Sequence, residues 1–267
     1  MNLVSVKQAL KKQDTPAKRA IVAAYRGLET TRLPTLPILH DALPAAIGAL
    51  GSALSWCLMR AYWRPIFARQ LMSPPRRLNL YGWGVPHTMG ALRISMGEDC
   101  RLSTQVTLAG RTWSRPTPEL VIGNNVGISW AQSIFVGRRV VLGHNVRIGG
   151  QGTLVGYPGH PLDPDLRAAG APDTDGQVGD IIIGDDAWLG RGVTVNAGVR
   201  IGRAAIIASG AVVTRDIPAG VLAAGVPARV VKVVAPDRQH APTLTDLLPA
   251  DDPGNARINV PYDARAH

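Results

Sequence analysis

The stretch IIIGDDAWLGRGVTVNAGVRIGRAAIIASGAVVT, residues 181–214, repeats its pattern every six residues. An apolar residue recurs at Ile183, Leu189, Val195, Ile201, Ile207 and Val213, and a second apolar or small series stands two positions earlier, at Ile181, Ala187, Val193, Val199, Ala205 and Ala211. Because residues two apart share one face of a strand, each hexad predicts a short strand with an inward pair, followed by a tight turn. One hexad cannot bury its face alone but stacked coils can, so the stretch predicts a β-solenoid.

The same register extends the predicted solenoid domain over residues 78–234. Hexads are imperfect from about Leu92 and become regular at Ile122, Ile128, Val136, Leu142 and Ile148. Residues 110–119 and 150–180 break the pattern, the second with prolines, glycines and four aspartates between Asp163 and Asp175. An insertion must leave the coil as a loop, and loops are where repeat proteins place function. Residues 150–180 are therefore the predicted functional loop.

The basic character of the chain lies in its first part. The formal net charge is +10, and residues 1–77 hold twelve Lys/Arg against three acidic residues. Thr15-Pro16 predicts a helix start, so residues 1–77 are expected to form a basic helical extension. Residues 235–267 are polar and contain prolines, which predicts an extended tail. No nucleic-acid recognition motif accompanies the charge, so no nucleic-acid partner is expected.

Residues 42–59 carry no charge, and Arg60, Arg64 and Arg69 follow them. Three interpretations stay open for this segment: a helix packed on the solenoid or in a trimer interface, a helix lying on an anionic membrane surface, and a membrane span. Lys7, Lys11 and Lys12 interrupt the first apolar residues, so no signal peptide is expected. We therefore expect a cytoplasmic protein that is peripheral at the inner face of the membrane if the second interpretation holds.

The cysteines and histidines predict no metal site. Cys57 and Cys100 offer neither a disulfide framework nor a metal cluster, which favours a reducing compartment. His40, His87, His240 and His267 show no ligand spacing, and His144 stands at a turn position of its hexad. A zinc enzyme on a solenoid would need several histidines at ligand spacing across the coils.

Several blocks resemble the hexapeptide-repeat acyltransferases, closest to the maltose, galactoside and polysaccharide O-acetyltransferases. The matching blocks are Gly159–Pro164 with Arg167 beyond it, Ile183–Gly190, Ala208–Pro218 and Ala224–Arg229. The resemblance covers about residues 90–234. It implies a mainly β fold, a left-handed parallel β-helix, and a homotrimer whose active site lies in the groove between subunits.

By this resemblance, His160 is the general base in a direct transfer from acetyl-CoA to an acceptor hydroxyl, because imidazole titrates near neutral pH. Trp188 stands between the inward positions Ala187 and Leu189, so its ring should point outward, where the resemblance makes it line the transfer tunnel. Asp163 either shapes the acceptor site or caps the turn after Pro161. Arg167 is expected to pair with Asp163 or with a sugar hydroxyl.

The resemblance also implies a coenzyme A groove along the later coils. The residues matched to it are Arg191, Ala208, Ser209, Thr214, Arg229 and Lys232. Basic side chains near the end of the groove suit the nucleotide phosphates.

The acceptor pocket departs from the sugar-acetylating pattern. Where those relatives carry an acceptor-binding Asn, this chain has the segment Ser129-Trp130-Ala131-Gln132. Trp130 suits either stacking on a sugar ring or packing on a coil. We expect an O-acetyltransferase acting on a sugar, a polysaccharide precursor or a similar acceptor. The alternatives are an N-acyltransferase acting on an amino sugar and a non-catalytic trimeric scaffold.

Overall fold

The computed structural model describes residues 15–30 and 36–235, and the chain divides into two compact units, residues 1–54 and 55–267. The first unit holds α2 (Pro16–Thr30), and the Thr15 hydroxyl accepts a hydrogen bond from the Lys18 N–H at 3.3 Å. The predicted helix start at Thr15-Pro16 is therefore confirmed. The predicted C-terminal tail falls, apart from Ala235, outside the described residues.

A second helical run extends from Ile38 to Ala68 as η1 (Ile38–Ala42), α3 (Leu43–Leu58), η2 (Met59–Trp63) and α4 (Arg64–Ala68). Its two π-helical stretches, η1 and η2, each end just before a proline, Pro44 or Pro65, which lacks the N–H that an α-helical bond needs. Residues His40–Ala68 form the one described helix long and apolar enough to cross a membrane, with a mean hydropathy of 1.6. No residue of α3 is buried.

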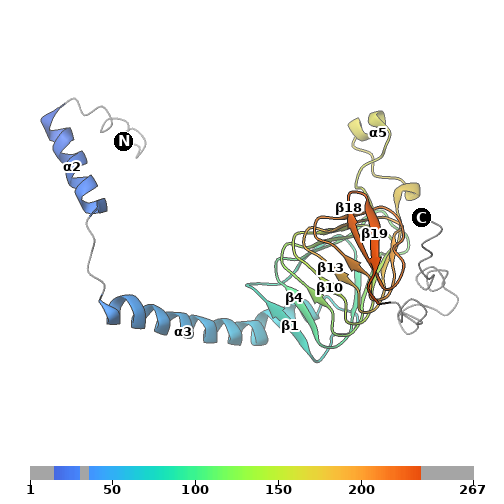
Figure 1. Ribbon diagram of the computed structural model, residues 1–267, viewed down its shortest axis with the longest axis horizontal. Helices are drawn as coiled ribbons and strands as arrows, with labels where there is room; N and C mark the ends of the chain where they lie inside the picture. Colours follow the sequence, from blue (N-terminus) through green and yellow to red (C-terminus); the bar gives the residue numbers. More distant parts are fainter. Residues whose placement is uncertain (1–14, 31–35, 236–267) are drawn as a thin grey trace. The chain divides into compact units, whose positions relative to one another are not determined.

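Short parallel strands from residue 78 onward build three sheets, one along each face of a stack of coils (Figure 1). The first sheet contains β1 (Leu78–Tyr81), β4 (Cys100–Ser103), β7 (Gly127–Ile128), β10 (Arg147–Ile148), β13 (Trp188–Leu189), β16 (Ile206–Ile207), β18 (Val221–Gly225) and the antiparallel β19 (Ala228–Val233). The second contains β2 (His87–Met89), β5 (Thr107–Gly110), β8 (Ser133–Val136), β11 (Thr153–Val155), β14 (Thr194–Asn196) and β17 (Val212–Val213). The third contains β3 (Arg93–Met96), β6 (Glu119–Ile122), β9 (Arg139–Leu142), β12 (Ile181–Ile183) and β15 (Arg200–Ile201).

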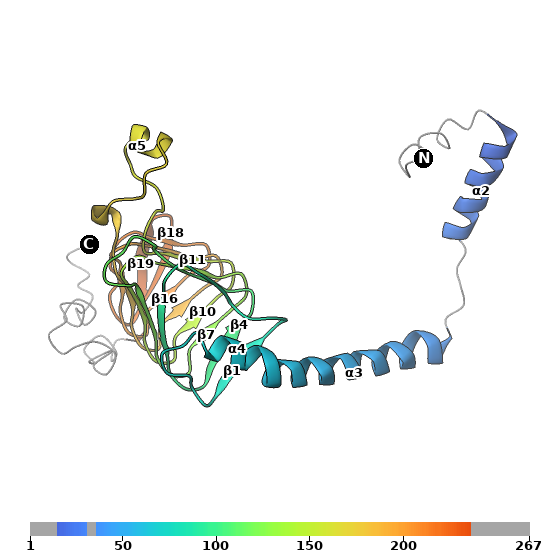
Figure 2. The same cartoon turned by 180° about the vertical axis from the view of Figure 1, so that it is seen from behind.

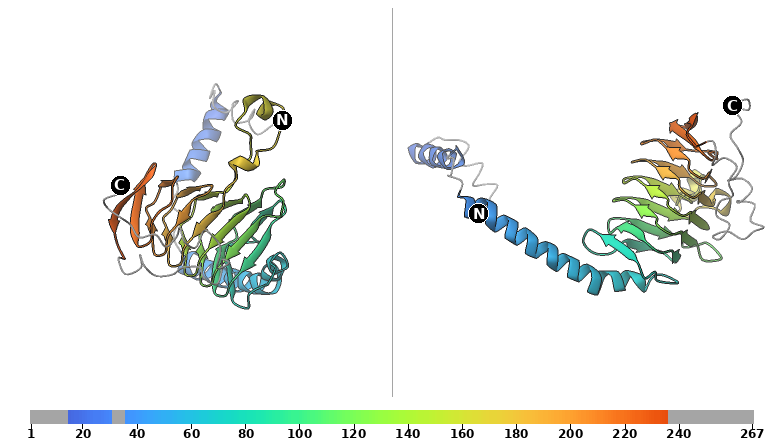
Figure 3. Two further views of the ribbon diagram at one scale, coloured as in Figure 1. Left: turned by 90° about the vertical axis from the view of Figure 1, so that its right-hand side faces the viewer. Right: turned by 60° about the horizontal axis from the view of Figure 1, so that its bottom comes forward.

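The hexad positions fill the inside of the stack. In the second sheet, Leu108, Ile134, Leu154, Val195 and Val213 follow one another in register, and all are completely buried. Side chains in equivalent positions of neighbouring coils therefore form continuous apolar columns. The predicted mainly β solenoid with a helical N-terminal extension is confirmed, and Figure 3 shows the coils as successive layers.

In each of five successive coils, the chain turns the same corner at a residue with positive φ. These residues are Asp99, Asn125, Asn145, Asp186 and Ala204. Asp and Asn tolerate this left-handed conformation better than most residues. Their side chains also join the coils, because the Asn125 amide donates to Asn145 Oδ1 and the Asn145 amide donates to Asp186 Oδ1.

The first coil begins with β1 at Leu78, inside the predicted solenoid domain 78–234. The hexad pattern is not visible before about Leu92, because Thr88 stands in register with the buried Leu108. The structure corrects one predicted boundary. The predicted loop 150–180 still contains β11, since Leu154 is buried between Ile134 and Val195. Only residues 156–180, the His160 loop, leave the coil. The interruption at 110–119 is confirmed as a loop between β5 and β6.

Candidate active site

The His160 loop leaves the stack after β11 of the second sheet and returns at β12 of the third (Figures 1 and 2). It carries α5 (Pro164–Ala168) and the short helix η3 (Asp175–Gln177). His160 is exposed, whereas Pro161, the next residue, is buried. The buried proline therefore anchors a segment whose imidazole is accessible from outside.

Asp163 and Arg167 fold this segment. Asp163 caps α5, because its carboxylate accepts hydrogen bonds from the N–H groups of Asp165 and Leu166 at 2.8 and 3.0 Å. Arg167 Nη1 donates to the carbonyl oxygens of Pro161 and Leu162 at 2.9 and 3.0 Å. The capping alternative for Asp163 is therefore the one seen. The expected Asp163–Arg167 pair is wrong, since the guanidinium binds main-chain oxygens instead.

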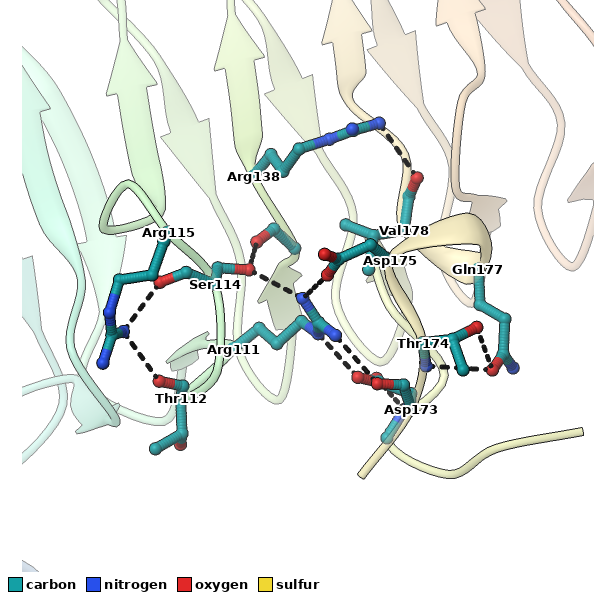
Figure 4. A network of polar contacts seen from close by, with 12 residues as sticks. Arg111, Thr112, Ser114, Arg115, Arg138, Asp173, Thr174, Asp175, Gln177 and Val178 are labelled. Carbon is teal, nitrogen blue, oxygen red and sulfur yellow. Dashed lines mark hydrogen bonds and ion pairs between the residues drawn. The ribbon is translucent and has the colours of Figure 1, made fainter. Parts of the chain in front are cut away.

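A buried arginine ties the His160 loop to the solenoid (Figure 4). Arg111, which is 4% exposed, follows β5 directly. Its guanidinium contacts the carboxylates of Asp173 and Asp175, each at 2.6 Å, and donates to the Asp173 carbonyl at 2.8 Å. It also donates to the Ser114 hydroxyl, which in turn donates to the Gly137 carbonyl at 2.6 Å. One side chain thus joins the loop at 111–118, a coil and the His160 loop.

The aspartates keep this arginine charged. Burial by itself lowers the pKa of the Arg111 guanidinium, but the hydrogen bonds and negative charges of Asp173 and Asp175 outweigh burial and raise it. Burial also raises the pKa of the neighbouring Tyr157 phenol, and the Asp173 charge raises it further. The cluster is therefore a fixed ion pair with a neutral phenol beside it.

Asp173 of the Arg111 cluster and the nearby Gln177 form hydrogen bonds with the main chain at Gly159 and His160. Asp173 Oδ2 accepts a hydrogen bond from the Gly159 N–H at 2.9 Å, and Gln177 Nε2 donates to the His160 carbonyl at 3.1 Å. The backbone of His160 is thereby braced from the far end of its own loop. No sequence signal pointed to Arg111, and Asp173 was only one of four aspartates between Asp163 and Asp175 in an irregular segment.

Ser129 and Trp188 line a common cavity on the outer face of the first sheet. Trp188 is 55% exposed and points outward, as its place between two inward residues predicts. The cavity has a volume of about 500 Å³, and Tyr81, Arg101 and Arg147 also line it. The two arginines were not among the residues predicted for the site.

Trp130, Arg191 and Ser209 stand along the edge between the first and second sheets, and the coil that carries Gln151 lies between those of Trp130 and Arg191. The Trp130 carbonyl accepts a hydrogen bond from the Gln151 N–H, and the Arg191 carbonyl accepts one from the Gly210 N–H. Arg191 Nε also donates to the Gln151 side chain at 2.7 Å. Ala208 lies beside Ser209 on this edge, so the structure groups these four predicted residues.

The remaining predicted coenzyme residues lie elsewhere on the later coils. Thr214 follows β17 at the far end of the second sheet and is exposed. Arg229 and Lys232 are exposed on β19, and Arg229 lines a cavity of about 350 Å³ with Arg215 and Asp216. These cations therefore lie at the last coil rather than beside Arg191.

One chain presents the candidate residues on different faces. The His160 loop leaves between the second and third sheets, whereas Ser129 and Trp188 belong to the first. Within residues 15–30 and 36–235, no group of three or more His, Cys, Asp or Glu side chains is arranged to hold a metal ion.

Comparisons with known proteins show which family the repeat region is similar to. The family described as bacterial transferase hexapeptide (six repeats) matches residues 180–215. Galactoside O-acetyltransferase of Escherichia coli (strain K12) is 34% identical over 140 residues, which are 50% of this chain and 66% of that protein. The enzyme of the same name from Lactococcus lactis is 42% identical over 97 residues, 36% of this chain and 42% of that protein. The chain thus matches less than two thirds of each relative's length.

A solved structure titled galactoside acetyltransferase in complex with coenzyme A covers 62% of this chain and 69% of its own, with 27% identity and a TM-score of 0.40. The resemblance expected from the sequence motifs is confirmed by the family match and the two relatives. The described solenoid is a hexapeptide-repeat β-helix, and over half of its length the chain is similar to a galactoside O-acetyltransferase.

Proposed function

We propose that this protein is an acetyl-CoA-dependent acyltransferase that acetylates a hydroxyl group of a sugar, a polysaccharide precursor or a similar acceptor. The observation that carries the proposal is His160, an exposed imidazole on a loop whose backbone is braced on both sides. The similarity to galactoside O-acetyltransferases over the solenoid supports the same reaction class.

His160 acts as the general base. Its neutral imidazole takes the proton of the acceptor hydroxyl while that oxygen attacks the thioester carbonyl of acetyl-CoA. The carbon–sulfur bond breaks as the new ester bond forms, and the proton passes to the departing thiolate. The bracing by Asp173 and Gln177 keeps the ring in place during this transfer, and such positioning contributes to the rate.

The later coils suit an elongated co-substrate. Arg191 and Ser209 are exposed along one edge, where Gly190 allows close stacking: a Cβ there would lie 2.6 Å from the Ser209 nitrogen. Arg229 and Lys232 supply two cations at the last coil for the nucleotide phosphates of acetyl-CoA. Acetyl-CoA is therefore the proposed co-substrate, and the reaction needs no metal ion.

The active site is completed between subunits of a homotrimer. The His160 loop and the Trp188 cavity belong to different faces of one chain, so the loop of one subunit meets the first-sheet face of its neighbour. Trp188 and Ser129 then line the acceptor side, and Trp130 lies near the coenzyme edge. The apolar helix His40–Ala68 holds this assembly at the inner face of the cytoplasmic membrane, close to a glycan or glycolipid precursor.

The test is release of coenzyme A thiol from acetyl-CoA with a panel of sugar acceptors. His160→Ala should lower kcat by a factor of about 10² to 10⁴, the usual contribution of a general base. His87→Ala is the matched control, because His87 is also exposed and lies far from the loop on β2. Full turnover in the His160 variant would remove the proposed base.

The acceptor panel separates the alternatives. Amino sugars tested beside their hydroxyl counterparts distinguish transfer to nitrogen from transfer to oxygen, because only the former yields an alkali-stable amide. A wild-type protein that releases no thiol with any acceptor would instead favour the scaffold.

A further inference from the structure

A second cavity, of about 530 Å³, lies at the start of the solenoid, away from the His160 loop. We call it the arginine pocket, because five arginines line it: Arg60, Arg64, Arg76, Arg77 and Arg101. The first two come from η2 and α4, the next two from the segment before β1, and the last from β4. Three separate chain segments therefore bring guanidinium groups to one place.

The carboxylates near the arginine pocket already accept hydrogen bonds from Arg76 and Arg77. Asp99 is the one acidic residue among those lining it, and its two oxygens accept bonds from Arg77 at 2.6 and 2.7 Å. The neighbouring Glu98 accepts from the main-chain N–H groups of Arg76 and Arg77 at 3.0 and 2.8 Å. Among the described residues, the other four guanidinium groups therefore have no carboxylate partner.

Their contacts are with neutral groups. Arg60 stacks over the Trp56 ring, with 5.0 Å between its Cζ and the ring centroid, and Arg64 donates to the Arg76 carbonyl. Arg101 Nη2 donates to Asn125 Oδ1 at 3.0 Å. These contacts orient the guanidinium groups without forming an ion pair, and Asp99, which is bonded to Arg77, is the one carboxylate of the described residues that lies close to Arg101.

The next coil adds a sixth arginine to this positive surface. Arg147 Nη2 donates at 3.2 Å to the same Asn125 Oδ1 that Arg101 uses. Burial lowers the pKa of the Arg147 guanidinium, and the nearby charge of Arg101 lowers it further. Two like charges that share one neutral acceptor repel each other, and a bound anion would relieve that repulsion.

The arginine pocket adjoins the apolar helix. Arg60 and Arg64 belong to the last part of the candidate membrane span His40–Ala68, which has no buried residues in its 18-residue apolar window. A cluster of arginines next to an apolar helix is typical of proteins that bind anionic lipid head groups. The position therefore fits a ligand that combines phosphate with an apolar chain.

We propose that the arginine pocket binds a phosphate or diphosphate ester, with the guanidinium groups of Arg60, Arg64 and Arg101 as donors. The planar guanidinium matches phosphate oxygens with paired hydrogen bonds. The volume is within the usual range for small-ligand sites and exceeds that of a single ion. The proposal does not rest on the acyl-transfer reaction, because Arg60 and Arg64 lie outside the candidate active site, although Arg101 also lines the Trp188 cavity.

The first arm of the test uses a soluble probe. Inorganic pyrophosphate is titrated calorimetrically into the full chain in non-ionic detergent, and saturable binding is expected. Arg60→Gln/Arg101→Gln should weaken binding at least about tenfold, since it removes two charge-assisted donors. Arg19→Gln/Arg26→Gln is the matched control, because it removes the same charge from exposed positions of α2.

The second arm identifies the source of the phosphate. Phosphatidylcholine vesicles with phosphatidate are compared with vesicles that carry phosphatidylglycerol at equal surface charge. Preference for phosphatidate that the pocket variant loses and the α2 control keeps assigns the site to a lipid. Binding of pyrophosphate without that preference assigns it to a soluble phosphate ester. Failure of both probes to saturate, or equal weakening in both variants, would overturn the proposal.

Discussion

Arg111 shows how one side chain can organise a site without being near the reacting atoms. Its guanidinium is almost fully buried, and its partners come from the loop after β5 and from the far end of the His160 loop. Removal of one member of a buried pair leaves the other charge without solvent or partner. The Arg111–Asp173 pair therefore affects the free energy of unfolding mainly through the cost of removing one partner.

Arg111→Met should lower the free energy of unfolding by about 3–5 kcal/mol, since it leaves the Asp173 carboxylate buried and unpaired. Urea denaturation of the full chain measures this change. Arg138→Met is the control: that side chain is 59% exposed and 3.9 Å from Asp180, so its loss should change stability by about 1 kcal/mol or less. Equal effects of the two substitutions would show that the Arg111 cluster does not clamp the loop.

Two carboxylates at the first coil, Glu98 and Asp99, give a pH dependence. The main-chain N–H groups of Arg76 and Arg77 lower the pKa of Glu98, and the hydrogen bond from Arg77 lowers the pKa of Asp99. A lowered pKa in the folded state stabilises the fold above the ordinary values of 4.5 and 3.8, and the contribution is lost as the pH falls through the folded values.

Stability should therefore decline below about pH 4.5 in the wild type, and less steeply in Glu98→Gln/Asp99→Asn. Thermal unfolding followed between pH 3 and 7 measures the difference. Parallel curves for the two proteins would mean that these carboxylates are not linked to folding.

At the residue scale, the sequence predicted positions better than contacts. The hexad alternation placed Trp188 outward, and the motif around His160 placed it in an expelled loop. Neither indicated that Arg167 would bind main-chain oxygens or that Arg111 would reach Asp173, 62 residues away. Such contacts depend on how two irregular loops fold against each other, and irregular loops carry no periodic signal.

At the scale of elements, the solenoid was predictable wherever an inward column is apolar. The hexad pattern did not show the first coil, because β2 offers Thr88 instead of an aliphatic side chain where its neighbour β5 supplies the buried Leu108. The lack of charge over residues 42–59 predicted a helix, and the structure has η1, α3 and η2 over those residues. Composition alone left open what covers this helix.

The two cysteines make that question measurable. Cys100 is fully buried and its thiol pKa is raised by burial, whereas Cys57 is exposed on α3. Only thiolates react readily, so a membrane-impermeant maleimide should label Cys57 alone in the native protein. Labelling should be strong without lipid and strongly reduced in phospholipid vesicles if the helix inserts.

The variant Cys57→Ser controls for slow reaction of Cys100, since it should remove native labelling altogether. Full labelling of Cys57 in vesicles that demonstrably bind the protein would contradict burial of α3 in the lipid. In that case, α3 would lie either in a contact between subunits or exposed to solvent.

At the scale of the whole molecule, the arrangement of candidate residues bears on assembly. The expelled loop and the Trp188 cavity lie on different faces of one coil stack, so one chain does not bring His160 to Trp188 through the solenoid. A cyclic arrangement in which each loop meets the first-sheet face of the next subunit solves this problem for every subunit at once. In a trimer of this kind, each site would depend on residues from two neighbouring subunits.

That dependence predicts complementation between two inactive chains. His160→Ala lacks the proposed base, and Trp188→Glu places a charge on the face that receives the loop. Each variant alone should release little thiol from acetyl-CoA. Trimers assembled at random from equal amounts of both contain sites in which an intact loop meets an intact face, and about a quarter of the sites should be of that kind.

Co-expression with two different tags and tandem purification yields the mixed assemblies, whose composition native mass spectrometry can verify. Recovery of about a third of the wild-type rate is expected, because tandem purification removes the trimers of a single chain type and each mixed trimer then contains one intact site out of three. Mixtures of His160→Ala with His160→Asn control for the purification and should stay inactive. Verified mixed trimers that also stay inactive would place His160 and Trp188 in the same subunit's site, or outside one site altogether, and the groove between neighbouring subunits would lose its role.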